Sequence, residues 1–356
     1  MSKDSSIQDQ VKNYYGKWLK KTEDLQTDVS SSKKTAPQSK SARDAMTLIH
    51  PEITERYFGC GFVVPEILEG CNVLDLGCGS GRDCYILSKL VGPNGHVTGV
   101  DMTVELIQLA SKHLSYHQEK FGYKEANIEF FEGCIEKLGD IGIQNNNVDV
   151  LVSNGVICLC PDKKAVFKEA YRVLKEGGEM YLIDVFASET LDEKLKVDPV
   201  LWGEGLAGTL YWKDLISLVM EVGFSKPYLV TAGNIAINKA ELLKKTGNVK
   251  YVSATYRFFK LPAGRSDQKA WVTYKGTVTD HEDQLVFDSV HTFKKDKAVE
   301  VDGELAMVLK TFRFAPHFVF KPVEGQEPLK DGSQQYCHLN PFLLADKQES
   351  SIQKCS

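Results

Sequence analysis

The sequence of 356 residues predicts an α/β fold: a doubly wound parallel sheet followed by a smaller C-terminal α+β domain. Three observations lead to this prediction. Short apolar runs typical of buried strands recur along the first half, at 73–76, 96–100, 127–131, 148–152 and 179–185. A segment of helical period at 165–174 separates the last two, and the connections are short. A glycine-rich turn follows the first run, where such sheets bind ligands.

The glycine-rich turn predicts the type of cofactor. Asp75 near the end of the first strand is followed by Gly77, Gly79 and Gly81. Glycine lacks Cβ, so it permits both the turn dihedrals and a close approach of backbone to ligand. The dinucleotide pattern G-x-G-x-x-G would need glycine at position 82, which is Arg82, so a nicotinamide cofactor is disfavoured. The spacing resembles the S-adenosylmethionine loop of class I methyltransferases, which usually carry an acidic residue at the position of Asp75.

Further candidate cofactor residues follow the other strands. Asp101 ends the second strand, where an acid is placed to hold a ribose. Ile135 and Glu136 lie just beyond the third strand, at a turn that borders the adenine in folds of this kind. Because the carboxyl ends of parallel strands meet at one edge, we expect these side chains to lie together. The predicted cofactor-binding residues are Tyr57, Asp75, Gly77, Gly79, Gly81, Asp101, Met102, Ile135, Glu136 and Asn154. No metal site is expected.

Composition excludes several classes of function. The formal net charge of −5 offers no basic face for nucleic acid. No apolar run approaches the roughly 20 residues that span a bilayer, and the polar N-terminus does not resemble a secretory signal. Nine cysteines are scattered through an α/β core, which favours reduced thiols and a cytoplasmic location over a disulfide framework.

The chain divides into four predicted regions. Residues 1–44 form a helix and a flexible linker, and 45–230 form the methyltransferase-like domain. Residues 231–325 form the C-terminal α+β domain, with strand-like alternation at 251–259, 270–274 and 286–293 and a helical pattern at 307–314. Residues 326–356 are a polar, loosely ordered tail.

From about residue 50 to 325 the chain resembles animal arsenite methyltransferases. The segments that carry this resemblance are not general to class I methyltransferases. They are 57–61, 74–83, 96–102, 135–139, 171–178, 202–204, 210–212 and 252–260. The resemblance implies S-adenosylmethionine as methyl donor, a Rossmann-like core, and a monomer in the cytosol.

The chain departs from this family at the positions that bind arsenic. Members that methylate arsenic hold As(III) through three cysteine thiolates, and a fourth cysteine nearer the N-terminus assists. Cys60 matches one of the three, whereas Gly155 and Gly205 stand at the other two, and 25–30 contain no cysteine. Arsenic(III) is soft and is held by thiolates, so a single thiolate cannot form the trigonal site. Cys158 supplies a further thiol only if the segment after Val156 turns it into the pocket.

These departures leave three functions open. The first is methyl transfer to a small-molecule acceptor at nitrogen, sulfur or oxygen, with arsenite excluded. The catalytic candidates are then Tyr57, Cys60, Asn154 and Glu204. Glu204 acts as base, Asn154 orients the acceptor, and the ring of Tyr57 attracts a cation. The second function is arsenite methylation with displaced thiols, and the third is non-catalytic binding of S-adenosylmethionine.

Overall fold

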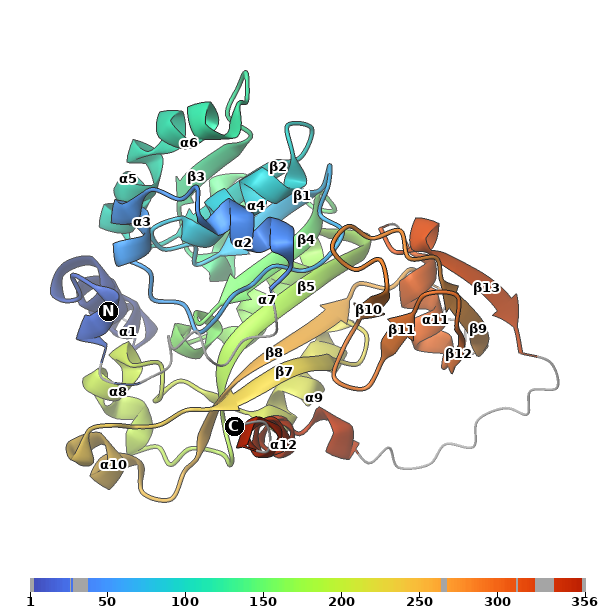
Figure 1. Cartoon of the computed structure of the whole chain (residues 1–356). Coiled ribbons are helices and arrows are strands. Elements are labelled where there is room, and N and C mark those ends of the chain that lie inside the picture. The colour runs from blue at the N-terminus through green and yellow to red at the C-terminus, as the bar shows by residue number, and fades with distance from the viewer. Residues whose placement is uncertain are drawn as a thin grey trace.

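The fold centres on one mixed sheet of eight strands (Figure 1). The computed structural model describes residues 3–25, 27, 38–263, 268–311, 313–323 and 336–353. The strand order is β3-β2-β1-β4-β5-β8-β7, with β6 paired to β5. These strands are β1 (Asn72–Leu76), β2 (His96–Asp101), β3 (Ile128–Glu132), β4 (Val148–Asn154), β5 (Leu174–Ala187), β6 (Leu210–Tyr211), β7 (Tyr228–Asn234) and β8 (Tyr251–Phe259).

The five predicted strands of the first half are present as β1 to β5. Each pair among neighbours β3-β2-β1-β4-β5 is parallel, which confirms the doubly wound, Rossmann-like core. Every residue of β4 is buried, as expected for a strand covered by helices on both faces. The carboxyl ends of these five parallel strands, β1 to β5, therefore share one edge of the sheet.

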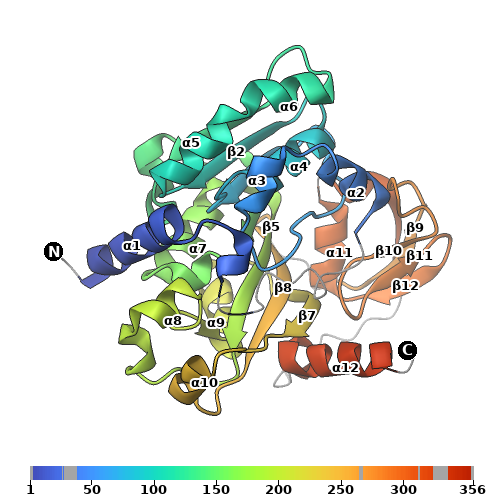
Figure 2. The same cartoon turned by 60° about the vertical axis from the view of Figure 1, so that its left-hand side comes forward.

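Helices cover both faces of this sheet (Figure 2). Because successive side chains of a strand point to opposite faces, Val73 packs in one hydrophobic cluster with Leu87 of α4, and Leu74 packs in another with Phe167 of α7. The helices are α1 (Lys3–Asn13), α2 (Lys40–Met46), α3 (Pro51–Glu55), α4 (Arg82–Val91), α5 (Val104–Lys112), α6 (Leu114–Phe121), α7 (Lys163–Val173), α8 (Pro199–Gly203), α9 (Trp212–Val222), α10 (Ala240–Thr246), α11 (Gly303–Lys310) and α12 (Pro341–Gln353). None of these described helices is long and apolar enough to cross a bilayer.

The strand predicted at 251–259 is present but lies in a different place from the one expected. It is β8, and it pairs antiparallel with both β5 and β7 inside the central sheet. All nine of its residues are buried, which an interior strand requires. The central sheet therefore continues past residue 230, where we expected the core to end. A strand pattern predicts burial of a segment, but it does not identify the partner strand.

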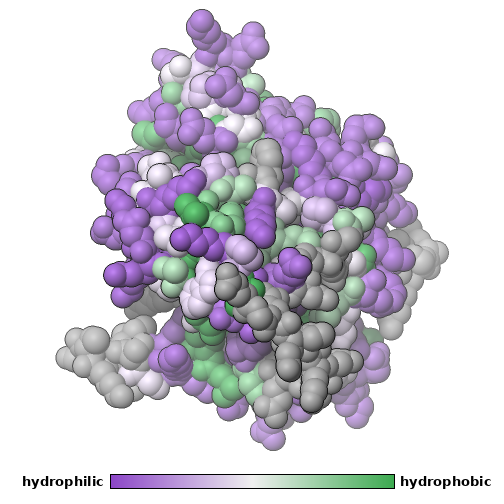
Figure 3. Space-filling model, turned by 90° about the vertical axis from the view of Figure 1, so that its right-hand side faces the viewer, coloured by the Kyte–Doolittle hydropathy of each residue, from purple (hydrophilic) through white to green (hydrophobic). Residues whose placement is uncertain are grey.

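The C-terminal domain is a smaller α+β unit beside the sheet. It holds a three-stranded sheet β12-β9-β13, the hairpin β10-β11 and α11. Its strands are β9 (Ala270–Tyr274), β10 (Gln284–Val286), β11 (Thr292–Lys294), β12 (Ala298–Val301) and β13 (Phe318–Pro322). The face of the molecule on the side of this domain is mainly hydrophilic, with scattered hydrophobic residues (Figure 3). The aromatic side chains of the domain are largely turned inward, into their own hydrophobic cluster.

The single strand predicted at 286–293 is wrong. The Asp288 carboxylate accepts hydrogen bonds from the backbone N–H groups of Val290 and His291, which closes a turn between β10 and β11. Aspartate forms such local turns readily, in competition with a continuing strand. The helix predicted at 307–314 begins earlier, at Gly303, because Asp302 caps it by accepting from the N–H of Leu305.

Both chain ends pack on the core more than the sequence suggested. The tail predicted to be loosely ordered contains α12, which lies against β7 and buries Ala345. Asn234 Nδ2 donates to Asp346 Oδ1 at 3.1 Å. At the other end, α1 and the π-helical turn η1 (Tyr14–Trp18) lie beside α8. Of the predicted linker, 28–37 lie outside the described residues, and α2 occupies its end.

Candidate active site

The glycine turn joins β1 to α4 at the carboxyl edge of the sheet. Gly77, Gly79 and Gly81 all have positive φ, between 54° and 84°, a region that side chains disfavour. A Cβ at Gly77 would collide with Val156, and one at Gly81 would collide with Phe130. A Cβ at Gly79 would meet no atom within 4 Å, so this part of the turn borders open space.

Two acids support the turn, Asp101, which is half-buried, and Asp75, which is buried. Asp101 Oδ2 accepts from the N–H of Gly79 at 2.9 Å, and Oδ1 accepts from the N–H of Thr103 at 2.8 Å. Burial raises the pKa of Asp101 although these hydrogen bonds oppose the rise. Asp75 is 2% exposed and accepts from Cys84 Sγ at 3.1 Å. Burial, reinforced by the Asp83 charge, raises the pKa of Asp75 to about 8.

A cavity opens in front of the glycine turn. The predicted cofactor-binding residues that line it are Tyr57, Asp75, Gly77, Gly79, Asp101, Met102, Ile135, Glu136 and Asn154. Gly81 does not line the cavity, since it is the N-cap of α4 and packs against Phe130 and Ala110. The topology therefore brings nine of the ten predicted residues together.

The N-terminal helix also contributes to this cavity, which the sequence did not indicate. Gln8, Val11 and Tyr15 line it. Gln8 Nε2 donates to Glu136 Oε1 and to Cys134 Sγ, both at 3.2 Å. The apolar face of this helix was visible in the sequence, but no local signal identified the segment on which it packs.

Beyond the cavity, Glu204 lies among tyrosines of the N-terminal segment. Tyr14 Oη donates to Glu204 Oε1 at 2.6 Å, and Tyr15 Oη donates to the carbonyl of Gly203 at 2.9 Å. Glu204 is 3% exposed. Burial raises the pKa of Tyr15 well above its usual value, with further contributions from Cys158 and Glu204. Neither Glu204 nor Cys60 lines the cavity itself.

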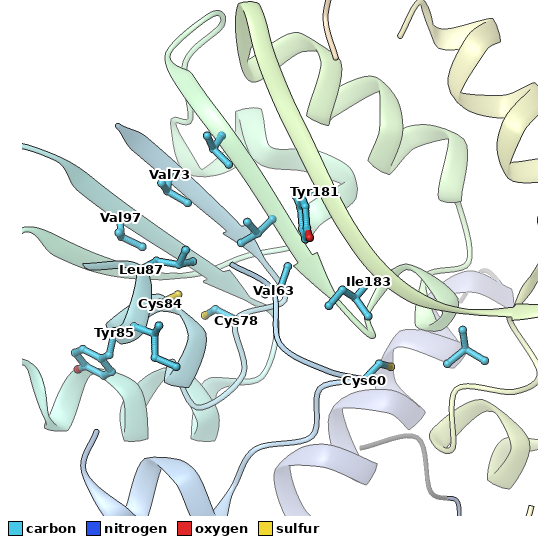
Figure 4. Close-up of a cluster of buried hydrophobic side chains, with 14 of the residues drawn as sticks. Cys60, Val63, Val73, Cys78, Cys84, Tyr85, Leu87, Val97, Tyr181 and Ile183 are labelled. Carbon is cyan, nitrogen blue, oxygen red and sulfur yellow. The ribbon is translucent and has the colours of Figure 1, made fainter. Parts of the chain in front are cut away.

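The two glycines singled out in the sequence each contact a buried thiol. A Cβ built at Gly155 would lie 2.6 Å from Cys60 Sγ, and one at Gly205 would lie 3.2 Å from Cys158 Sγ. Burial raises the pKa of Cys158 well above its usual range, and Asp184 and Cys60 add to the rise. Figure 4 shows Cys60 well apart from Cys78, which lies within the glycine turn, and Cys84, which lies in α4. Gly155, Gly205, Cys60 and Cys158 thus lie close together.

Comparison with known proteins identifies the family. A profile described as a methyltransferase domain matches residues 67–223, and one described as the arsenite methyltransferase C-terminal domain matches 267–356. The human arsenite methyltransferase is 46% identical over 359 residues, covering 99% of this chain and 95% of that protein. The chain belongs to the arsenite methyltransferase family. A relative from Aquipseudomonas alcaligenes is 44% identical over 88% of this chain and 90% of its own length. A solved arsenic(III) S-adenosylmethionine methyltransferase from Chlamydomonas reinhardtii superposes with a TM-score of 0.77 at 40% identity, covering 82% of this chain and 98% of that one.

Membership of the arsenite methyltransferase family makes this protein an S-adenosylmethionine-dependent methyltransferase. The residues present fit that cofactor. The open space at Gly79 gives the cofactor access to the backbone of the turn, and Asp101 holds that turn in place. When bound, S-adenosylmethionine supplies an electrophilic methyl group on a sulfonium. The individual roles of the lining residues remain predictions.

One cluster of possible metal ligands lies outside the cavity in the described part of this methyltransferase. Ligand atoms of His50, Glu52 and His113 lie within 4.8 Å of one another. The two imidazole rings are stacked, with centroids 3.9 Å apart and planes 26° from parallel. Their in-plane lone pairs therefore do not converge on one point, and Lys112 already pairs with Glu52 at 2.7 Å. This arrangement favours a surface ion-pair cluster.

Proposed function

We propose that this enzyme transfers a methyl group from S-adenosylmethionine to nitrogen, sulfur or oxygen of a small molecule, and that arsenite is not its acceptor. The observation that carries the proposal is the pair Gly155 and Gly205. Each glycine stands at a position where the family resemblance implies a cysteine, and each lies beside a thiol. Arsenite has three exchangeable valences and needs thiolates to hold it. Glycine supplies none.

The chemistry we assign needs a base and a positioned acceptor. Methyl transfer displaces the sulfonium in line, so the acceptor atom must be held close to the methyl carbon. A nitrogen, oxygen or thiol acceptor loses a proton in this process, and Glu204 is proposed to take it. Tyr14 and Tyr15 flank this carboxylate, and an aromatic face attracts a cationic amine.

A second candidate is methylation of arsenite by a displaced pair of thiols. Cys158 favours it, since this thiol lies against Gly205 as Cys60 lies against Gly155. Two thiolates still leave one arsenic valence unfilled, so we rank this function second.

One assay distinguishes the two candidates. The purified protein and methyl-labelled S-adenosylmethionine are incubated with As(III) and glutathione, and separately with a panel of amines, thiols and hydroxyl compounds. A relative that retains three cysteines serves as the comparator. We expect label in an organic product and no methylarsenic. Methylarsenic formed at a rate comparable to the relative would overturn the proposal.

Two variants test the roles proposed for these residues. Glu204→Gln keeps the shape of the side chain but removes the base, so turnover of the organic acceptor should fall about 10²- to 10⁴-fold. The double variant Gly155→Cys, Gly205→Cys restores thiols at the two positions, and we expect it to gain arsenite methylation. No gain in a folded double variant would show that these glycines are not the arsenic positions.

A further inference from the structure

The carboxylate of Asp83 accepts hydrogen bonds from two side chains, Arg82 and Asn154. Both of these side chains also contact the loop before β1. Asp83 is the second residue of α4, directly after the glycine turn, and is 5% exposed. Its Oδ1 accepts from Arg82 Nε at 2.9 Å and from Arg82 Nη2 at 2.6 Å. Its Oδ2 accepts from Asn154 Nδ2 at 2.8 Å. Both carboxylate oxygens are therefore engaged, by one cation and one amide.

Asn154 passes this interaction on to Cys60. The amide oxygen of Asn154 accepts from the backbone N–H of Cys60 at 2.8 Å. A backbone N–H can only donate, so the oxygen must face Cys60 and the NH₂ group must face the acceptors. Those acceptors are Asp83 Oδ2, Tyr57 Oη at 2.7 Å and the carbonyl of Gly61 at 3.1 Å. The orientation of the amide is thus fixed from both ends.

Arg82 makes the second connection to the same loop. Its guanidinium lies over the ring of Tyr57, 3.1 Å from the centroid, and Nη2 donates to the carbonyl of Gly61 at 3.3 Å. Both partners of Asp83 therefore contact residues 57–61. This segment carries Tyr57, which lines the cofactor cavity, and Cys60, which lies against Gly155.

We propose that Asp83 is a positioning residue for methyl transfer. Asp83 holds the 57–61 loop in a fixed position relative to the glycine turn. The loop lies on the proposed acceptor side, and the turn lies on the cofactor side. Asp83 follows the turn directly, so a carboxylate at this point can register the two sides against each other. Its hydrogen bonds are charge-assisted on both arms, which makes them short and directional. Small errors in the placement of reacting groups cost rate steeply, so this registration supports catalysis. Asp83 itself also lines the cofactor cavity.

The test uses Asp83→Asn and needs no acceptor. In this variant a neutral amide replaces the carboxylate, so an NH₂ group must face Arg82 or Asn154, donor against donor. Cys60 is 2% exposed, so its alkylation by N-ethylmaleimide, mapped by mass spectrometry, reports opening of the loop. We expect Cys60 to react at least about tenfold faster, and S-adenosylhomocysteine to bind at least about tenfold more weakly.

Asp149→Asn is the matched control. Asp149 is also 5% exposed, but it lies near the opposite end of β4, where it pairs with Lys175. We expect this variant to lose stability without a change in Cys60 labelling. Equal acceleration in both variants would assign the effect to general loosening and overturn the proposal. Wild-type labelling and affinity in Asp83→Asn would overturn it too.

A second variant keeps the proposal testable if Asp83→Asn does not fold. Asp83→Glu retains the charge but moves the carboxylate by one methylene, so labelling of Cys60 should rise by a smaller factor. Wild-type labelling and affinity in this variant would contradict the assignment. Because both measurements are independent of the acceptor, their outcome does not depend on whether the proposed function is correct.

Discussion

A buried ion cluster joins the central sheet to the C-terminal domain, and its removal should be costly. Arg257 on β8 donates through Nε to Glu179 Oε1 on β5 at 2.6 Å, and Arg313 pairs with the other carboxylate oxygen. The Glu179 and Arg257 side chains are 0% exposed. Arg257 also donates to the carbonyl of Phe287, and Arg313 donates to that of Glu66. Arg257 Nη1 also pairs with Glu66 Oε2 at 3.2 Å, so the central sheet, the C-terminal domain and the loop before β1 meet at this cluster.

The perturbation is Glu179→Gln. Burial alone would raise the pKa of Glu179, but the two guanidinium groups outweigh it and hold the pKa below the ordinary value, so the group is ionised in the native protein. Glutamine preserves the volume and removes the charge, which leaves the two buried cations with only the carboxylate of Glu66, 3.2 Å from Arg257 Nη1, as counter-charge. Removing one partner of a buried pair costs about 3–5 kcal/mol. That loss corresponds to an increase of roughly two to four powers of ten in the unfolding constant.

Urea unfolding measures the loss. Tryptophan fluorescence and circular dichroism are followed together, because coincident transitions are needed before a single free energy is quoted. We expect a lower midpoint for Glu179→Gln. The control is Glu221→Gln, which removes an exposed carboxylate paired with Lys164 and should not shift the midpoint measurably. A loss for Glu179→Gln within about 1 kcal/mol, the range of surface pairs, would show that this buried carboxylate contributes no more than an exposed one.

Three further outcomes are expected. Asp101→Ala removes the acceptor for the N–H of Gly79, so S-adenosylmethionine should bind at least about tenfold more weakly by calorimetry; unchanged affinity would exclude this anchoring role. The pKa of about 8 at Asp75 exceeds the unfolded value of about 3.9, so the native state binds the Asp75 proton more tightly than the unfolded state does. The contribution of this proton to stability is present at low pH and is lost as pH rises towards 8. In thermal melts, Asp75→Asn should therefore gain stability relative to the wild type between pH 6 and 8, and a constant difference would contradict the shift. Tyr14→Phe leaves buried Glu204 without its 2.6 Å donor and should cost about 1–3 kcal/mol by urea unfolding, whereas wild-type stability would show that another donor replaces it.

That the proposed cofactor-binding residues line one cavity was predictable, because the signal is local. Gly77, Gly79 and Asp101 lie within one strand-turn-helix-strand segment, and parallel strands bring their carboxyl ends to one edge. Ile135 and Glu136 follow from the same rule applied to the next strand. The wrong placement of β8 has the opposite cause, since its partners β5 and β7 are chosen by packing that no short pattern encodes.

The contacts on the proposed acceptor side were predictable only in part, since they join distant segments. Gln8 reaches Glu136 across 128 positions of sequence, and Tyr14 reaches Glu204 across 190. Asn154 was expected to orient an acceptor, whereas its amide is engaged by Cys60 on one side and Asp83 on the other. Such tasks depend on which loop lies opposite, which is a property of the whole fold.

The backbone at Gly155 and Gly205 gives an energetic reason for the two glycines. Both have φ of +71°, in the left-handed region, where a residue with Cβ costs roughly 1–2 kcal/mol. A cysteine at Gly155 would in addition displace Cys60 Sγ. In a relative that binds arsenic, arsenic–thiolate bonds would offset this strain. In a chain that binds another acceptor nothing offsets it, and glycine is the residue that fits.

The double variant Gly155→Cys, Gly205→Cys should carry this strain. Without As(III) it should melt at a lower temperature than the wild type, because the strain is uncompensated. With As(III) its melting temperature should rise with concentration, since a ligand bound only by the native state stabilises it. The wild type should respond less, because it lacks the two added thiols. Equal responses of the two proteins would mean that Cys60 and Cys158 already suffice to hold arsenic, which would favour the second candidate function.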